Sequence, residues 1–481
     1  MNKKDISKHH VSGFLVILIL TGISGFTQQG PLAFPGAEGF GKYTTGGRGG
    51  KVYVVTNLED DGPGSLRNAV EAKEKRFVVF SISGTIHLNS ELNFRGDLTV
   101  AGQTAPGDGI CIADYPVLLK GDNIIVRYMR FRMGDKNQKA GMIDGNGGDD
   151  AFGGTHRKNI IIDHCTMSWS TDEAFTVYAG DSTTLQWNLI AEPLNYSYHF
   201  EEGDTGYEHH GYGGIWGGEH MSAHHNLFAH CNNRTPRFNG IRNKRPEFVD
   251  FRNNVIYNWG ENNSYAGEGG SYNMLNNYYK PGPSTKKNAR DRFLNPYKKG
   301  EEIPFGKFFI AGNCLEGFPE ISAHNELGVE MHQGNAADRE IALVDKEFPA
   351  DPVTTQSAEA AYRLVLAHAG ASLHRDTLDQ RIVRDVQEGT GKLIDVQGGF
   401  PHGTEYELTR NAWPLLQYLQ APKDSDGDGM PDNWEKKMGL DVHQGNDATV
   451  VSLDPYYTNL ELYVNSLVPE NKRAQKTNVK N

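Results

Sequence analysis

Short apolar runs recur along the chain from about residue 30 to residue 330, separated by polar or glycine-rich stretches. The runs contain many β-branched and aromatic residues, a composition that favours strands over helices. No helical period interrupts them over about three hundred residues. The sequence therefore predicts a long series of short strands. Seven of the runs occupy residues 124–129, 160–165, 185–190, 222–228, 250–256, 274–279 and 310–314.

When the runs are aligned, one position in each forms a column in which five of seven residues are asparagine. Neighbouring members are 23 to 38 residues apart, which fits the coils of a parallel β-helix with loop insertions in the longer ones. Stacked asparagines at such turns can hydrogen-bond along the column. We therefore predict an all-β parallel β-helix (solenoid) rather than a β-sandwich with asparagine-rich turns. The column is Met129, Cys165, Asn188, Asn226, Asn254, Asn277 and Asn313.

The pattern changes after residue 330, where apolar side chains recur at helical spacing. Residues 357–369, followed by Gly370, predict one helix, and 376–387 predict a second. Residues 457–467 predict a further packing helix. These segments indicate a small, mostly helical C-terminal extension. The expected divisions are a β-helix catalytic domain (29–330), an extension with short helices (331–420), an acidic loop with its packing helix (421–470) and a disordered tail (471–481).

The first 28 residues have the pattern of a secretory signal peptide. A basic start precedes an apolar run at 14–19, which is shorter than a membrane span requires. The alternative is an uncleaved anchor. We expect cleavage and a protein that is secreted or periplasmic. The four cysteines can then pair in three ways or remain as unpaired core thiols.

Composition adds limits on the partners. The net charge is −12 and the mean hydropathy is −0.56, values typical of a soluble globular protein. An acidic balance argues against nucleic acid as the main partner. It also makes an acidic polymer a difficult substrate unless local cations or metals offset the repulsion. We expect a monomer with no membrane span.

An acidic stretch near the C-terminus follows the spacing of an EF-hand calcium loop. Side-chain ligands fall at positions 1, 3, 5, 9 and 12, a glycine at position 6, and a backbone carbonyl at position 7. A single loop of this kind predicts structural calcium rather than a calcium sensor; the alternative is an empty acidic turn. The predicted ligands are Asp424, Asp426, Asp428, Met430, Asp432 and Glu435.

Carboxylates also fall on successive turns inside the repeating region. Asp150 ends a glycine-rich stretch, and Asp172 and Glu173 follow about one coil later. Residues one coil apart lie close together on a β-helix, so these carboxylates can converge and bind a hard cation such as calcium. The alternative is that they are solvated surface acids.

Arginines gather about two coils further on. Arg234 and Arg237 flank Pro236, which disfavours helix at the preceding residue. Together with Arg242, Lys244 and Arg245 they make a local basic patch in an acidic chain, or, as the alternative, a solvated basic loop.

Taken together, these motifs resemble the family 1 polysaccharide lyases, the pectate lyases, from about residue 34 to residue 277. The residues that carry the resemblance are Asp150-Ala, the strands 159–165 and 183–188, and Arg234-Thr-Pro236-Arg237. Asp150 lies 13 residues before Asp163, as the metal aspartate does in that family. The resemblance implies a right-handed parallel β-helix that cleaves polygalacturonate by calcium-assisted β-elimination, giving unsaturated oligogalacturonides.

The resemblance also implies individual roles. Asp150 and Asp172 match calcium ligands, and Arg234 matches the base, with a substrate-carboxylate clamp as its alternative role. The proton to be removed lies α to a uronate carboxylate, where bound calcium stabilises the developing charge. A guanidinium holds its proton in water, so it acts as a base only where desolvation and neighbouring cations disfavour the charged form. Arg237, Tyr212 and Arg242 are the expected substrate contacts.

Three positions depart from the family pattern. The third calcium ligand falls at Thr176, where Glu173 or Asp149 can compensate. The substrate lysine falls near Tyr212. A second arginine falls at Asn239, where Arg242 or Arg245 can take its place.

Other functions remain open on the sequence. A polygalacturonase-type hydrolase is also a β-helix and uses paired aspartates, for which Asp149 and Asp150 are candidates. A pectin lyase and a non-catalytic glycan-binding β-helix are the further alternatives.

Overall fold

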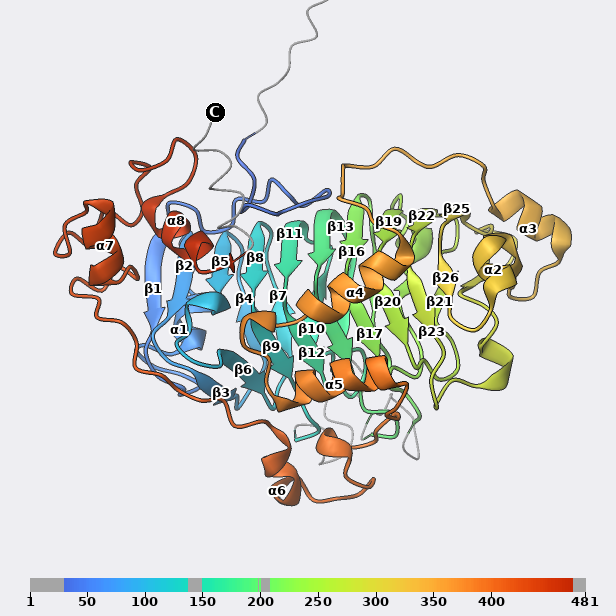
Figure 1. Ribbon diagram of the computed structural model, residues 1–481, viewed down its shortest axis with the longest axis horizontal. Helices are drawn as coiled ribbons and strands as arrows, with labels where there is room; N and C mark the ends of the chain where they lie inside the picture. Colours follow the sequence, from blue (N-terminus) through green and yellow to red (C-terminus); the bar gives the residue numbers. More distant parts are fainter. Residues whose placement is uncertain (1–29, 137–148, 198, 200–207, 470–481) are drawn as a thin grey trace, which may run out of the picture. The chain divides into compact units, whose positions relative to one another are not determined.

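The computed structural model describes residues 30–136, 149–197, 199 and 208–469 (Figure 1). The expected signal peptide (1–28) and the expected C-terminal tail (471–481) lie outside the described residues. From Pro31 onward, the described residues form one compact unit. Within the described part, no helix is both long enough and apolar enough to cross a membrane.

The strands form a parallel β-helix in which each full coil adds one strand to each of three parallel ladders. We call these sheet 1, sheet 2 and sheet 3. The long strand β13 belongs to sheet 3 in its first half and to sheet 1 in its second half. This arrangement confirms the fold expected from the repeating apolar runs.

Sheet 1 contains β1 (Lys51–Val55), β2 (Arg76–Phe80), β5 (Leu98–Ala101), β8 (Ile124–Arg127), β11 (Lys158–Asp163), β13 (Phe175–Gln186), β16 (Met221–His224), β19 (Phe248–Arg252), β22 (Ser271–Leu275) and β25 (Lys307–Ala311). Sheet 2 contains β3 (Gly84–His87), β6 (Ile110–Ala113), β9 (Met129–Arg132), β12 (Thr166–Ser168), β14 (Leu189–Ala191), β17 (Leu227–Ala229), β20 (Val255–Tyr257), β23 (Tyr278–Lys280) and β26 (Cys314–Leu315). Sheet 3 contains β4 (Leu92–Phe94), β7 (Val117–Leu119), β10 (Phe152–Thr155), β13, β15 (Ile215–Gly218), β18 (Arg237–Phe238), β21 (Ser264–Ala266) and β24 (Leu294–Pro296).

Alternation along each strand sends one side chain into the solenoid and the next outward. Inward positions stack from coil to coil. The rings of Phe152 and Phe175, paired across β10 and β13, lie parallel with centroids 5.7 Å apart, and Trp216 on the next coil is fully buried. A column of aromatic side chains thus fills part of the interior.

The asparagine column lies at the corner between sheet 1 and sheet 2, as expected. The backbone N–H of Asn226 donates to Oδ1 of Asn254 (3.0 Å), and the same pairing continues from Asn254 to Asn277 (2.9 Å). The residue before each column position turns the chain in a left-handed conformation, for example His225 with φ of 56°. The column ends at Asn325, which sequence analysis missed because it follows a helix and not a strand.

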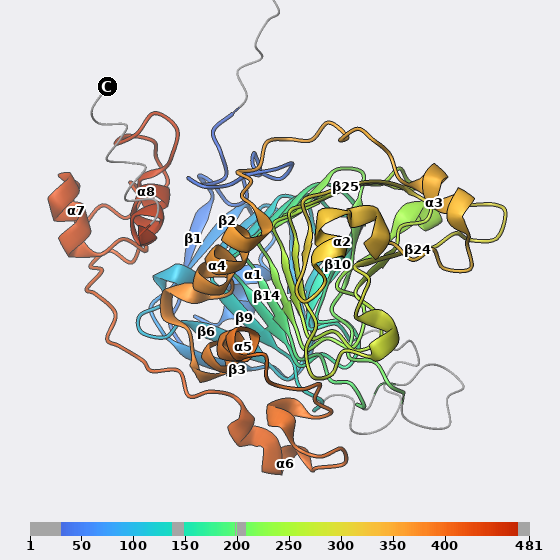
Figure 2. The same ribbon diagram turned by 45° about the vertical axis from the view of Figure 1, so that its right-hand side comes forward.

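Helices cover the outside of the solenoid. The helices expected at 357–369 and 376–387 are α4 (Ala358–His368) and α5 (Thr377–Glu388), which follow the N-caps Ser357 and Asp376 and pack on sheet 2 (Figure 2). The buried Arg132 of β9 binds Asp379 of α5 at 2.8 Å, which fixes the helix on the strand. Shorter helices are α1 (Leu66–Val70), α2 (Pro319–Ala323), α3 (Ala336–Ala342) and α6 (Tyr406–Thr409).

The last two helices, α7 (Asp432–Met438) and α8 (Asn459–Ser466), lie beside the first strands of sheet 1 (Figure 1). The packing helix expected at 457–467 is α8. All four cysteines are unpaired and three of them are buried. The expectation of core thiols therefore holds for those three, and none of the possible disulfides forms.

Candidate functional site

The residues singled out in the repeating region meet at the corner between sheet 2 and sheet 3. Asp150 precedes β10, Glu173 precedes β13, and Tyr212 and Arg234 precede β15 and β18 on the next two coils. Glu173 pairs in parallel with Tyr212, and Tyr212 pairs with Asn233. Residues about 23 to 40 positions apart in sequence are therefore neighbours, because parallel strands on successive coils lie about 4.8 Å apart.

Three carboxylates converge at this corner. Asp150, Asp172 and Glu173 each present an oxygen within 4.8 Å of the others. Oδ1 of Asp150 accepts the backbone N–H of Glu173 at 3.1 Å, which fixes its orientation. Oxygen donors gathered in this way fit a hard cation such as calcium. Of the two acids expected to compensate for Thr176, Glu173 lies in this group.

Burial dominates the electrostatics of Asp150. It raises the pKa of this carboxyl to about 8, although a hydrogen bond with Thr176 and the charge of Arg234 act in the opposite direction. The ionised form therefore needs a compensating positive charge at neutral pH. A divalent cation held between Asp150 and its two neighbouring carboxylates would supply that charge.

Arg234 lies directly beside the carboxylates. Its guanidinium forms an ion pair with Glu173 and stacks on the ring of Tyr212, 4.1 Å from the ring centroid. Its backbone is left-handed, with φ of 59°, and its N–H donates to the side chain of Asn233 at 2.8 Å. The side chain is 23% exposed, so part of it faces solvent. Tyr212, expected to contact substrate, contacts this arginine.

Arg237 and Arg242 share a carboxylate that sequence analysis did not identify. Nη2 of Arg237 lies 2.8 Å from Oε1 of Glu268, and Nε of Arg242 lies 3.9 Å from Oε2. Arg237 is buried and also donates to the carbonyl of Phe238 at 2.8 Å. The basic patch is therefore partly neutralised by an acid 31 residues beyond Arg237, which only the coil arrangement brings near.

His210 is a further residue that sequence reasoning did not assign to the site. Its Nε2 lies 3.4 Å from Oδ1 of Asp172, and its ring packs on Tyr212 with centroids 4.2 Å apart. Burial lowers the pKa of His210 to about 3, so the imidazole is neutral at physiological pH. A neutral imidazole adds no positive charge beside Asp172.

The C-terminal acidic loop forms a second group of carboxylates. Asp424, Asp426 and Asp428 present oxygens within 4.8 Å of one another, and Asp428 does so again with Glu435 and Asp447. Asp447 lies outside the twelve-residue loop, and sequence analysis missed it. The Met430 side chain packs in the apolar cluster beneath the loop.

Asp432, a predicted ligand, lies in neither group. Its carboxylate accepts the backbone N–H of Ser425 at 2.8 Å and lies 3.0 Å from Nζ of Lys423. These contacts join Asp432 to the start of the loop.

Among curated proteins, the most significant matches to this chain are described as pectate lyases. "Probable pectate lyase C" of Aspergillus fumigatus is 35% identical over 475 residues, covering 94% of this chain and 98% of the relative. Its counterpart in Emericella nidulans is 35% identical over 447 residues, covering 91% and 93%. A solved structure, "Pectate lyase bound to hexasaccharide", is 14% identical with a TM-score of 0.47, covering 73% of this chain and 99% of that one. No protein-family model matches.

Proposed function

Because this chain belongs to the pectate lyase family, we propose that it cleaves polygalacturonate by β-elimination at the corner between sheets 2 and 3. One observation carries the proposal. Three carboxylates suited to a hard cation lie beside an arginine on a neighbouring coil. One of the three, Glu173, forms an ion pair with that arginine, Arg234. Cation and base must lie this close because the abstracted proton leaves from C5, the same carbon atom that carries the uronate carboxylate.

Asp150, Asp172 and Glu173 are the residues that would hold calcium. Bound there, calcium stabilises the negative charge that develops on the uronate when the α-proton leaves. Asp150 is fixed by its hydrogen bond with the Glu173 backbone, so little reorganisation is needed when substrate binds.

In its neutral form Arg234 accepts the proton at C5 of the uronate, and the electron pair of that C–H bond forms the C4–C5 double bond. The bond from C4 to the glycosidic oxygen breaks, and the released oxygen takes a proton from water. The stacked ring of Tyr212 holds the guanidinium on the substrate side of the corner. The ion pair with Glu173 opposes this role, since a carboxylate favours the charged guanidinium. Glu173 would therefore have to leave Arg234, as holding a cation with Asp150 and Asp172 would require, before Arg234 could serve as the base.

Arg237 and Arg242 supply positive charge along the outer face of the site. Glu268 orients both side chains. The buried Arg237 would contribute to the electrostatic potential at the site, and the partly exposed Arg242 would contact a uronate carboxylate. Tyr212 is a positioning residue for Arg234 in addition to the substrate contact expected from sequence.

Export and assembly are part of the same proposal. The polymer is too large to cross a membrane, so the enzyme must be exported to reach it, in agreement with a cleaved signal at residues 1–28. We expect it to act as a secreted or periplasmic monomer. In this proposal, residues 29–330 carry the catalytic site, and residues 331–420 and 421–470 are two further units of the C-terminal extension.

The test is an ultraviolet assay on polygalacturonate with and without chelator. A lyase leaves a C=C bond that absorbs in the ultraviolet, so absorbance should rise in calcium and stop rising in chelator. Reducing ends without absorbance would identify the hydrolase instead, and a preference for methylated polymer without calcium would identify a pectin lyase. Binding with no new products would leave only a glycan-binding protein.

A further inference from the structure

Three buried carboxylates outside the catalytic corner have no compensating charge among the described residues in contact with them. Asp428, Glu435 and Asp447 are 3%, 0% and 6% exposed, and their oxygens lie within 4.8 Å of one another. Both carboxylate oxygens of Glu435 lack a hydrogen-bond partner in the described structure. Burying such groups is costly unless a cation or hydrogen bonds offset it. The arrangement therefore points to a bound cation.

Asp447 connects this group to α8. It lies in the segment between α7 and α8, where its carbonyl accepts the side-chain N–H of Asn459 at 3.0 Å. The next carbonyl, of Ala448, accepts the backbone N–H of Leu460 at 3.0 Å. A cation bound by Asp428, Glu435 and Asp447 would therefore join the loop, α7 and the first turn of α8.

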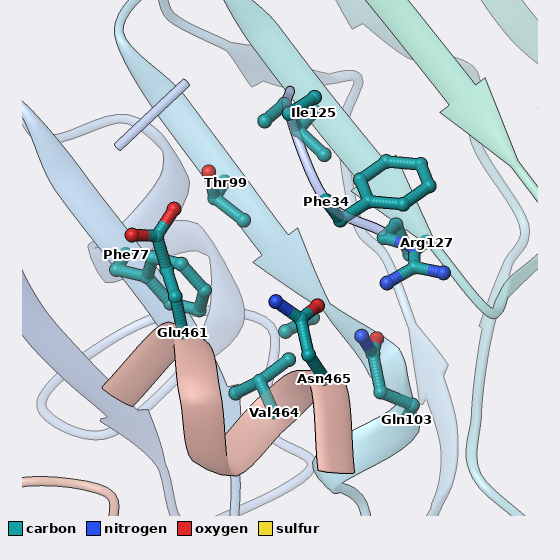
Figure 3. Close-up of a pocket in the computed structure, with 11 residues that line it drawn as sticks. Phe34, Phe77, Thr99, Gln103, Ile125, Arg127, Glu461, Val464 and Asn465 are labelled. Atoms are coloured by element: carbon teal, nitrogen blue, oxygen red, sulfur yellow. The ribbon is translucent and has the colours of Figure 1, made fainter. Parts of the chain in front are cut away.

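Helix α8 in turn covers the first coils of the solenoid. Its Leu460 and Val464 pack with Phe77 and Val79 of β2, in the cluster that also contains Met430. Figure 3 shows Glu461, Val464 and Asn465 of α8 directed toward the strands behind the helix, near Phe77 and Thr99. Oε1 of Glu461 lies 2.8 Å from Nε of Arg48, which adds a partly buried ion pair to the apolar contact.

We propose that a calcium ion bound by Asp428, Glu435 and Asp447 is a clasp that holds α7 and α8 on the first coils of the β-helix. The EF-hand spacing alone assigns Asp432 to the ion and omits Asp447. In the structure, Asp447 lies beside Asp428 and Glu435, whereas the carboxylate of Asp432 contacts Lys423 and Ser425. Asp424 and Asp426 form a neighbouring group that shares Asp428 with these carboxylates. The clasp does not require the catalytic site.

The test compares Asp447→Asn with Asp432→Asn by limited trypsin digestion of the full protein, with calcium and with chelator. Lys436 and Lys437 are exposed but lie in α7, so cleavage there requires local opening. An ion that binds only the closed form slows cleavage by the factor 1 + [Ca²⁺]/Kd, about 100-fold at a free calcium concentration of 100 Kd. The parent protein should show this protection.

Asp447→Asn should lose nearly all calcium-dependent protection while being cleaved at the parent rate in chelator, which shows that it is folded. Asp432→Asn should be cleaved faster in both conditions but keep the protection ratio. Asp441→Asn, which changes an exposed acid of the same segment, is the matched control and should behave as the parent. Full protection in Asp447→Asn, or loss of the ratio in Asp432→Asn instead, would overturn the clasp. Lyase activity is not needed for the readout.

Discussion

At the scale of residues, Glu173 is the point where the two halves of the proposed chemistry meet. Its carboxylate is grouped with Asp150 and Asp172, and it also pairs with Arg234. A carboxylate cannot fully serve a divalent cation and a guanidinium at once, because each takes the same lone pairs. Calcium binding and the availability of Arg234 are therefore expected to be coupled.

The first prediction separates the base from the cation ligands. Arg234→Lys should keep a positive charge yet lose roughly 100-fold in kcat, because lysine does not reproduce the reach and geometry of the guanidinium. Polygalacturonate binding should survive, since ground-state and transition-state interactions separate in such variants. Steady-state kinetics and a binding titration measure the two effects.

The matched comparison is Asp150→Asn and Asp172→Asn. Both should require much more calcium for activity and recover partly at high calcium, whereas Arg234→Lys should not recover. If Arg234→Lys keeps a near-normal kcat, or if the Asn variants respond to calcium like the parent, the site is assigned wrongly.

The second prediction concerns the coupling. Arg234→Gln should tighten calcium binding at the catalytic corner by about 3- to 10-fold, because it removes a competing ion pair that contributes on the order of 1 kcal/mol. Glu173→Gln should weaken it. Calorimetric titration without substrate measures both. Arg237→Gln is the control, since Arg237 is paired with Glu268. An equal gain in calcium affinity in that variant would mean that the loss of any nearby positive charge, and not of the ion pair with Glu173, causes the effect.

At the scale of elements, the corner between sheets 1 and 2 determines the register of the solenoid. Each corner consists of one left-handed residue followed by a column residue, and where the column residue is asparagine its side-chain amide binds the adjoining coils. Three of the left-handed residues, Trp187, His164 and His225, stack on one another outside the corner. Ring stacking and the ladder together compensate for a backbone conformation that these residues otherwise avoid.

The third prediction tests the ladder. Asn254 donates to Asn277 and to the carbonyl of Ala223, and it accepts from Asn226. Asn254→Ala leaves these buried groups without partners and should lower the free energy of unfolding by about 3 kcal/mol. Denaturant titration measures the change, and Asn243→Ala, at an exposed position, is the control. A change below about 1 kcal/mol would mean that the strands alone set the register.

At the scale of the whole molecule, elements from the far C-terminus cover coils from the start of the chain. Met430 and α8 bury apolar residues of β2 that face outward from the solenoid, while α4 and α5 cover sheet 2. The first coils therefore depend for their outer packing on a segment more than 350 residues away. That segment in turn depends on the proposed calcium ion to stay folded on these coils.

The fourth prediction follows from this dependence. Removing calcium should speed amide hydrogen exchange in α7, α8 and the neighbouring strands β1 and β2, because local opening becomes less costly. Strands β19, β22 and β25, which lie further along the solenoid, should keep their protection. Hydrogen exchange followed by mass spectrometry resolves the two regions, and uniform acceleration across the chain would contradict a local clasp.

The sequence by itself determined the coil repeat, the asparagine column, the positions of α4 and α5, and the identity of Asp150, Asp172 and Arg234 as candidates. These features are local patterns or fixed spacings, and a parallel β-helix converts spacing directly into proximity. Only the tertiary structure decided the pairing of Arg234 with Glu173, of Arg237 with Glu268, and the exchange of Asp432 for Asp447. Each depends on the direction in which a side chain leaves a corner or loop, and that direction is set by packing between segments that the linear order of residues keeps apart.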